Sequence, residues 1–318
     1  MPPSVSILIP CYNAEPWIGD AIDSALAQTH PDTEVVVYDD GSTDASVDVI
    51  RQYGDRIHWD SGPNRGGGSA RNWLLENTEK EWIQYLDADD YLEPDKVKEQ
   101  ADAIATGEVA SDADVVYGPV TFQHHEGETI RREVEPIQHP NDPWASLVTW
   151  DLPQTGSPLW RKSALLDVDG WKDDQPVCQE HELYLRLLKA DTTFEYHPSG
   201  GAVYRHWSDQ TVCRADEART YRYRLAITKD AEAFMREHDL MTPARREALD
   251  RAYLSCARII WTFDRSWAEE VMRHAAQNRT SPLSLPSDAV PTLYRWLFRT
   301  IGFSGAEQVA SWKRKLIS

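Results

Sequence analysis

The sequence predicts an α/β protein with a mostly parallel sheet, helices on both faces of that sheet, and a helical region after it. Two observations lead to this prediction. Over the first 120 residues, short apolar runs of strand length alternate with segments of helical apolar spacing. After about Glu217 the strand-like runs stop and helical spacing dominates. Alternation of the first kind is typical of βαβ units, whose parallel strands lie between two layers of helices.

The individual elements follow from the spacing of the apolar residues. A short continuous apolar run indicates a buried strand, and apolar residues three and four apart indicate a helix. Proline in the first turn supports the helix that begins at Pro94. In chain order, strands are predicted at Val5–Ile9, Glu34–Tyr38, Ile57–Trp59, Trp82–Leu86 and Val115–Tyr117, and helices at Trp17–Gln28, Ser46–Tyr53, Ser69–Asn77 and Pro94–Thr106.

The pattern changes after about Gly118. Thr121–Val134 predicts an antiparallel ribbon with its turn at His124–Glu128, and Glu180–Ala190 predicts a helix. Trp144–Trp171 is rich in Pro, Trp and Gly, and its pattern is hard to assign to helices or strands. We therefore expect a catalytic or binding domain over residues 1–217 and a helical C-terminal region over residues 218–318, broken around Arg279–Pro291.

Composition limits the classes of function. The chain has 318 residues, of which 41% are hydrophobic, and it carries 52 acidic against 33 basic residues, a net charge of −19. Such a surface repels nucleic acid. No apolar run reaches the roughly 18 residues that a membrane-spanning helix needs, and the N-terminus lacks a basic signal region. We expect a cytoplasmic protein whose four scattered cysteines stay reduced.

Polar clusters directly follow three of the predicted strands. They are Pro10-Cys11-Tyr12-Asn13, Asp39-Asp40-Gly41-Ser42 and Asp87-Ala88-Asp89-Asp90. In a parallel sheet the carboxyl ends of the strands share one edge, where ligands bind. Alternating carboxylates such as Asp87 and Asp89 can offer oxygen ligands to a hard divalent cation, with diphosphate oxygens completing the shell. Asp39-Asp40-Gly41-Ser42 alone also fits a turn with a helix cap at Ser42 or Ser46, and acids such as Asp87 and Asp89 are common at the starts of loops.

Three sequence runs that contain these clusters, taken in their order along the chain, resemble a known family. The runs VSILIPCYNAEPWIGDAIDSALAQTHPDTEVVVYDDGSTD, NRGGGSARN and WIQYLDADDYLEPDKV resemble the GT-A type glycosyltransferases of family 2. The resemblance is close over roughly residues 4–100 and weaker to about residue 215. It implies a GT-A fold and a metal-dependent enzyme that transfers a sugar, with inversion, from a nucleoside-diphosphate sugar to a glycan or lipid-linked acceptor, as in polysaccharide biosynthesis.

The resemblance also implies roles for single residues on the donor side. Tyr12 would lie against the base of the donor, with uracil the favoured base, and Pro10 beside it counts among the donor-binding residues. Asp40, rather than Asp39, would accept a hydrogen bond from the base. Arg71 would supply positive charge near the base or the diphosphate.

The same resemblance implies a metal site in the DXD motif. Asp89 would be the main ligand of Mg²⁺ or Mn²⁺, with Asp87 nearer the ribose or a metal-bound water. The cation would neutralise the leaving diphosphate. Gly66, Gly67 and Gly68 either bring the backbone close to the donor or form a flexible turn, because no lysine follows to complete a phosphate loop.

The catalytic base is expected at Glu180. The family places an acidic Glu-Asp pair before a helix, and the matching residues here are Gln179 and Glu180. A carboxylate at this position would take the proton of the acceptor hydroxyl. Gln179 departs from the pattern, and Glu182 is the second candidate for the base. The departure also keeps open a catalytically inactive nucleotide-sugar-binding protein. A sugar nucleotidyltransferase is the other alternative, but its Gly-rich phosphate signature with a catalytic lysine is missing.

Two later segments carry weaker expectations. Tyr204–Gln210 resembles a loop that closes over the donor, where Arg205 or His206 could contact the diphosphate. Trp150, Trp160 and Trp171 either line an acceptor site or pack in the core.

The last 28 residues are basic and aromatic. Residues 291–318 hold five basic residues and one acidic residue, a net charge of +4, so the other 290 residues carry −23. Two interpretations stay open. The segment either packs its basic face on the acidic body, which the sequence favours, or it lies on an anionic membrane, where lipid-linked acceptors are found.

Overall fold

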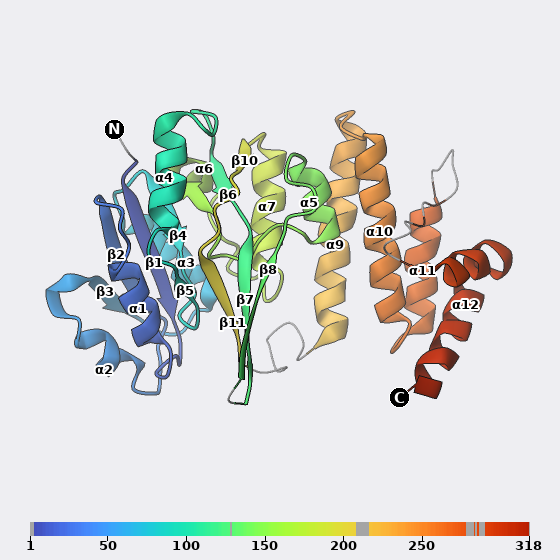
Figure 1. Ribbon diagram of the computed structural model, residues 1–318, viewed down its shortest axis with the longest axis horizontal. Helices are drawn as coiled ribbons and strands as arrows, with labels where there is room; N and C mark the ends of the chain where they lie inside the picture. The colour runs from blue at the N-terminus through green and yellow to red at the C-terminus, as the bar shows by residue number, and fades with distance from the viewer. Residues whose placement is uncertain are drawn as a thin grey trace. The chain divides into compact units, whose positions relative to one another are not determined.

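The computed structural model describes residues 3–127, 129–207, 216–277, 283, 285 and 290–317. They form two compact units, one from residues 1–143 and 151–214, the other from residues 144–150 and 215–318. The first unit contains the sheets, and the second is helical (Figure 1). Each unit is described by itself below.

A seven-stranded sheet forms the centre of the first unit. Its strand order is β10-β6-β9-β4-β1-β2-β3, in which β9 alone runs antiparallel to its neighbours. The strands are β1 (Val5–Cys11), β2 (Thr33–Asp39), β3 (His58–Ser61), β4 (Trp82–Tyr85), β6 (Val115–Tyr117), β9 (Leu159–Arg161) and β10 (Phe194–Tyr196).

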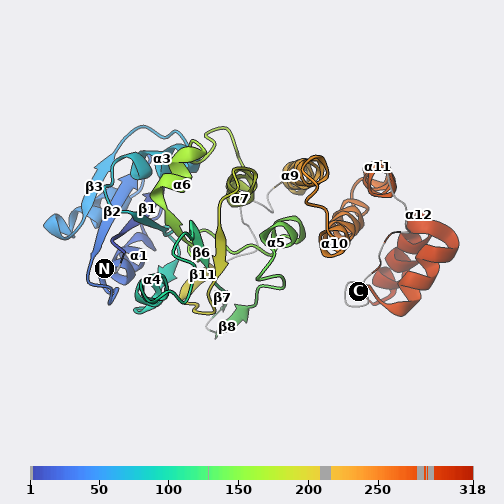
Figure 2. The same ribbon diagram turned by 90° about the horizontal axis from the view of Figure 1, so that it is seen from above.

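Helices cover both faces of this sheet. Figure 2 shows α1 and α4 on one face, with α3 and α6 on the other. Helix α1 buries Ile18, Ala21, Ile22 and Ala25, the stripe that its sequence spacing predicts. The helices of this unit are α1 (Ile18–Leu26), α2 (Ser46–Arg51), α3 (Gly67–Glu76), α4 (Lys96–Thr106), α6 (Lys162–Asp167) and α7 (Gln179–Lys189), with a short 3-10 helix at Gly54–Arg56.

A second, four-stranded sheet lies in the same unit. It consists of β5 (Tyr91–Leu92), β11 (Ala202–His206), β7 (Val120–Glu126) and β8 (Thr129–Glu135), in that order. The predicted antiparallel ribbon is confirmed as β7 and β8, but its turn is shorter than predicted because pairing continues to Glu126 and Thr129. The prediction of a loop from Tyr204 onward is wrong for Tyr204–His206, which form β11; residues 208–210 lie outside the described residues.

The helical unit contains α5 (Pro143–Thr149), α9 (Glu217–Glu237), α10 (Pro243–Ile260), α11 (Arg265–Ala276) and α12 (Thr292–Ile317). Trp144 of α5 stacks on Phe234 of α9. A residue with left-handed backbone, Gly302 (φ 74°), breaks α12 into two helices. Most of the predicted break around Arg279–Pro291 lies outside the described residues. Within the residues that the structure describes, no helix has the length and apolar composition needed to cross a bilayer.

Candidate active site

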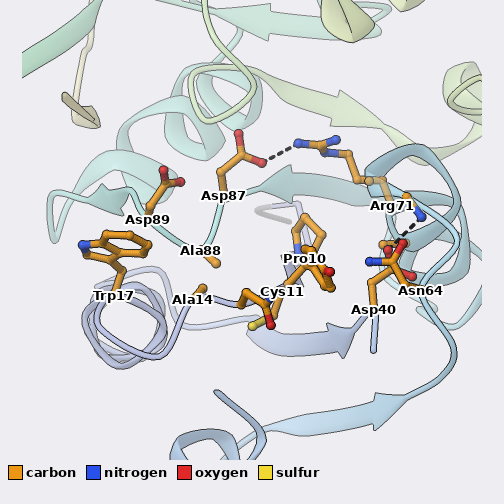
Figure 3. A pocket seen from close by; sticks show the side chains of 15 residues that line it. Pro10, Cys11, Ala14, Trp17, Asp40, Asn64, Arg71, Asp87, Ala88 and Asp89 are labelled. Atoms are coloured by element: carbon orange, nitrogen blue, oxygen red, sulfur yellow. Dashed lines mark hydrogen bonds and ion pairs between the residues drawn. The ribbon is translucent and has the colours of Figure 1, made fainter. Parts of the chain in front are cut away.

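A cavity of about 460 Å³ opens at the carboxyl edge of the large sheet. The residues that follow β1, β2 and β4 line it, together with the start of α3 (Figure 3). Six of the residues predicted from the sequence are brought together here: Pro10, Tyr12, Asp40, Arg71, Asp87 and Asp89. Parallel pairing of β1 with both β2 and β4 explains why strand ends far apart in sequence meet at one cavity.

Backbone hydrogen bonds hold Asp40 at the end of β2. Its two carboxylate oxygens accept the N–H groups of Arg65 and Gly66, each at 2.8 Å. Gly66 has φ +94°, a conformation that other residues rarely adopt, so glycine is needed for this contact. Asp39 is buried like Asp40, but it accepts the N–H of Ser42 at 3.2 Å. Of the two acids, Asp40 lines the cavity.

The loop after β1 is tied to the loop after β2. The N–H of Asn13 donates to Ser42 Oγ at 2.9 Å, and Asn13 Oδ1 accepts the N–H of Thr43 at 2.8 Å. Asn13 takes a positive φ of 49°, which asparagine tolerates better than most residues. Tyr12, which precedes Asn13, lines the cavity with 51% of its surface exposed.

Arg71 of α3 is the buried cation of the cavity. Its Nη2 pairs with Asp87 Oδ1 at 2.5 Å (Figure 3), and its guanidinium lies 4.7 Å from the centre of the Trp171 ring. Burial alone would lower the pKa of Arg71, but the charges of Asp87 and Glu180 outweigh burial and raise it. Arg71 is therefore a permanent positive charge at the wall of the cavity. Trp171, like Trp160, is buried, so both tryptophans pack in the core.

The acids after β4 crowd negative charge at the other end of the cavity, beside Trp17 (Figure 3). Burial raises the pKa of Asp89, and the nearby charge of Asp87 adds to the effect. Asp90 is buried, and burial followed by the charges of Asp89 and Asp87 raises its pKa well above the usual value. This is the electrostatic situation that a bound cation relieves.

The residues fit a cation that is shared with a ligand. In the described part of the chain, no group of three or more His, Cys, Asp or Glu side chains could hold a metal by itself. Mg²⁺ takes about six oxygen ligands and usually keeps water or phosphate among them. Asp87 and Asp89 can supply carboxylate oxygens, so the remaining ligands would come from a diphosphate and water.

Arg205 has a structural position that the sequence did not predict. Its Nε donates to the backbone carbonyl of Asp89 at 2.5 Å, and its Nη1 pairs with Asp20 at 2.7 Å. Its backbone N–H donates to Asp90 Oδ1 at 2.8 Å. Arg205 is buried and is absent from the residues that line the cavity. These contacts hold the Asp87–Asp90 loop, and a contact between Arg205 and a diphosphate stays a prediction.

The two candidate bases on α7 have different surroundings. Glu180 is partly exposed and accepts a hydrogen bond from Thr155 Oγ1 at 2.8 Å. Glu182 is buried and binds Arg186 and Lys172, with ion-pair distances of 2.9 and 2.6 Å. The charge of Glu182 is therefore neutralised within the fold. Glu180 is not among the residues that line the cavity, but it lies close enough to Arg71 to influence its pKa.

Sequence reasoning missed several residues of the cavity. Trp17, Asn64, Ala14 and Ala70 line it alongside the predicted residues. The apolar spacing predicts Trp17 inside the first helix, but it precedes α1, and the centre of its ring lies 6.0 Å from that of Trp207. The sequence does not show that an aromatic residue just before a helix lines a cavity, because a tryptophan at that position could equally well pack in the core.

Fold and cavity together define an α/β protein with a cavity lined by acids, an arginine and aromatic residues at the carboxyl edge of its sheet. The model of the family described as glycosyl transferase family 2 matches residues 6–164. The chain belongs to this family, as its sequence motifs imply.

Similar curated proteins and solved structures agree with this family. An uncharacterized glycosyltransferase of Rickettsia felis is 31% identical over 193 residues, which cover 59% of this chain and 32% of that protein. The chain thus spans about a third of the length of the curated Rickettsia relatives that it matches. The crystal structure of S. aureus TarS 1–349 in complex with UDP has a TM-score of 0.61 at 18% identity, covering 98% of this chain and 91% of that one.

A second solved structure is the mannosyltransferase PcManGT from Pyrobaculum calidifontis in complex with GDP-Man and Mn²⁺. It has a TM-score of 0.52 at 17% identity and covers 99% of this chain and 88% of that one. At these identities the likeness concerns the fold, and it confirms the predicted GT-A architecture with a helical C-terminal region.

Proposed function

We propose that this protein is an inverting glycosyltransferase that uses a nucleoside-diphosphate sugar, with a UDP-sugar favoured, and a divalent cation. The observation that carries the proposal is the cavity itself, which combines an exposed aromatic ring, a buried arginine and two carboxylates along one sheet edge, of which Asp87 pairs with the arginine and Asp89 has a raised pKa. Family membership and the fold of nucleotide-bound neighbours support it. No observation favours a nucleotidyltransferase.

The donor would lie along the cavity from Tyr12 to Asp89. Its base would stack on Tyr12 beside Pro10 and reach Asp40, whose carboxylate is held in place by the loop before α3. Arg71 would face the diphosphate. Asp87 and Asp89 would hold Mg²⁺ or Mn²⁺, which supplies charge neutralisation of the leaving diphosphate.

Glu180 is the proposed catalytic base. Its carboxylate is oriented by Thr155 and is partly exposed, so an acceptor hydroxyl can approach it. Deprotonation of this hydroxyl makes it a nucleophile, and attack from the side opposite the diphosphate inverts the anomeric carbon. The acceptor class that we propose is a glycan or a lipid-linked sugar.

We also propose that α12 contacts an anionic membrane surface, which would place the enzyme at the inner face of a membrane. Apolar side chains of this helix remain exposed: Leu293, Trp296, Ile301, Val309 and Trp312. Arg299 and Lys313 are exposed on the same helix. Aromatic and basic residues combined in this way are typical of helices that lie in the interface of anionic bilayers.

A panel of nucleotide sugars tests which donor, and which nucleobase, the protein binds. Thermal shifts would be recorded with UDP-, GDP-, TDP- and CMP-sugars, each with and without Mn²⁺. We expect metal-dependent stabilisation by one diphosphate sugar, of a size set by its concentration relative to Kd. Asp89→Ala should abolish the shift, whereas Asp112→Ala, at an exposed loop aspartate, should keep it.

The Glu180→Gln variant separates binding from chemistry. It should bind the same donor as the wild type and lose at least about 100-fold in donor turnover, the usual contribution of a general base. The absence of a thermal shift with every nucleotide sugar would refute the donor proposal. Full turnover by Glu180→Gln would remove Glu180 from the mechanism.

A further inference from the structure

Gln179, the residue that departs from the family pattern, contacts the cation of the donor cavity. Its Oε1 accepts a hydrogen bond from Arg71 Nη1 at 2.9 Å. Its Nε2 donates to the backbone carbonyl of Gln175 at 2.7 Å. The second bond fixes the orientation of the amide, because only the oxygen end can then face the guanidinium. Gln179 thereby joins the first residue of α7 to α3.

The guanidinium of Arg71 is enclosed on several sides. Nη2 pairs with Asp87, the Trp171 ring packs nearby, and only 8% of the residue is exposed. A Cβ atom on Gly67 would lie 3.1 Å from Nη1 and 3.7 Å from Gln179 Oε1, so the absence of a side chain there leaves room for this contact. The position of Arg71 is therefore set by an acid, an amide and a ring.

The charges around Arg71 explain why the amide matters. Asp87 pairs with it directly, and Glu180 is the next residue after Gln179 and acts on the pKa of Arg71. These two carboxylates already exceed the single positive charge of Arg71. A glutamate at position 179 would add a third in direct contact, and an anionic diphosphate would then meet a more negative wall.

We propose that Gln179 is a positioning residue that holds Arg71 toward the diphosphate of the donor, and that its neutral amide keeps a further negative charge away from this diphosphate. The proposal rests on the proposed function. On this proposal, glutamine in place of an acid at position 179 serves donor binding and does not indicate an inactive protein.

Affinities for UDP and GDP, and for uridine and guanosine as their phosphate-free counterparts, test the proposal in Mn²⁺ buffer by calorimetry. Gln179→Glu should weaken binding of the diphosphate at least tenfold and change binding of the nucleoside less than twofold. A variant that merely distorted the site would weaken both. Gln52→Glu, which adds the same charge at the exposed residue that follows α2, should bind like the wild type.

Gln179→Met separates charge from hydrogen bonding, because it has a similar length with neither charge nor an amide. We expect it to lose about threefold in diphosphate affinity, between the wild type and Gln179→Glu. Wild-type affinity in Gln179→Glu, or weaker binding in Gln179→Met than in Gln179→Glu, would overturn the inference alone. Failure of the wild type to bind either diphosphate would overturn the proposed donor and this inference together.

Discussion

At the scale of single residues, the function of an acid depends on its partners more than on its place in a motif. Glu180 and Glu182 are two residues apart on α7, about 200° around the helix. One is directed to a neutral hydroxyl and solvent, and the other to two cations. A sequence shows the spacing but not the partners, which come from residues 155, 172 and 186.

Cys11, which lines the cavity, provides a pH-dependent prediction. Burial, followed by the nearby charges of Asp39 and Asp44, raises the pKa of its thiol to about 11, although Ser46 and Ser42 act in the opposite direction. Only the thiolate reacts with alkylating agents. The alkylation rate of native Cys11 should therefore rise about tenfold per pH unit from pH 8 to pH 10.

Peptide mass spectrometry after timed iodoacetamide pulses measures this rate, with the urea-unfolded chain as the control. In the unfolded chain the thiol has its ordinary pKa of about 8.5, so its rate should level off above pH 9. A native rate that also levels off at pH 9 would contradict a raised pKa. The same shift lowers stability at high pH. Between the unfolded pKa of about 8.5 and the native pKa of about 11, only the unfolded state releases the proton, so the free energy of unfolding falls as pH rises.

At the scale of elements, close packing decides where the chain needs glycine. Helix α3 begins at Gly67, two residues before the start that apolar spacing predicts. Gly68 lies in its first turn, where a Cβ atom would come within 2.5 Å of the backbone carbonyl of Lys172. The glycines before Arg71 thus serve packing as well as the cavity.

Gly68→Ala should destabilise the protein by about 1–3 kcal/mol, since the backbone that it meets must shift. Gly19→Ala in α1 is the matched control. Its Cβ would make only ordinary contacts, 3.5 Å or more away, and alanine is the better helix former, so stability should stay equal or rise by up to about 1 kcal/mol. Urea unfolding midpoints measure both changes, and equal midpoints for the two variants would contradict the packing argument.

Helix α4 shows a tertiary effect on a charged side chain. Its apolar spacing is apparent in the sequence, yet Lys96 at its start is 2% exposed and donates to Gln84 of β4. Burial lowers the pKa of Lys96 well below its usual value. A lysine at the start of a helix predicts a solvated side chain, so the contact between Lys96 and Gln84 could not be predicted from the sequence.

At the scale of the whole molecule, charge is divided unevenly along the chain. The last 28 residues carry +4 and the remainder −23. Within the helical unit, Glu307 is fully buried and binds Arg258 of α10 at 2.9 Å, while the apolar side chains of α12 described above remain exposed. Part of α12 therefore packs within its unit, while apolar side chains of both its helices are exposed.

Vesicle sedimentation tests the membrane contact. The wild type should bind vesicles of phosphatidylglycerol and phosphatidylcholine, and binding should weaken as salt is added, since cations of α12 contribute. The double variant Trp296→Ala and Trp312→Ala should bind at least tenfold more weakly. The pair Ile130→Ala and Val134→Ala, at exposed positions of β8, should bind like the wild type. Equal binding by both double variants would refute the role of α12.

Much of this protein was determined by its sequence. Apolar runs of strand length predicted β1, β2, β4 and β6 within one or two residues, because a strand buried on both faces leaves an uninterrupted signal. The acids and Tyr12 at the strand ends could be assigned to one edge, because parallel strands bring their carboxyl ends together. The family followed from the order of these clusters.

Only the tertiary structure decided the rest. Strands β5, β9, β10 and β11 are two to five residues long and gave no periodic signal, since pairing partners distant in sequence stabilise them. The partners of Arg71, Glu180 and Gln179 likewise come from separate elements. Periodicity indicates which face of an element is buried. The contacts that orient a charged side chain depend instead on which elements pack against each other, and only the tertiary structure determines this.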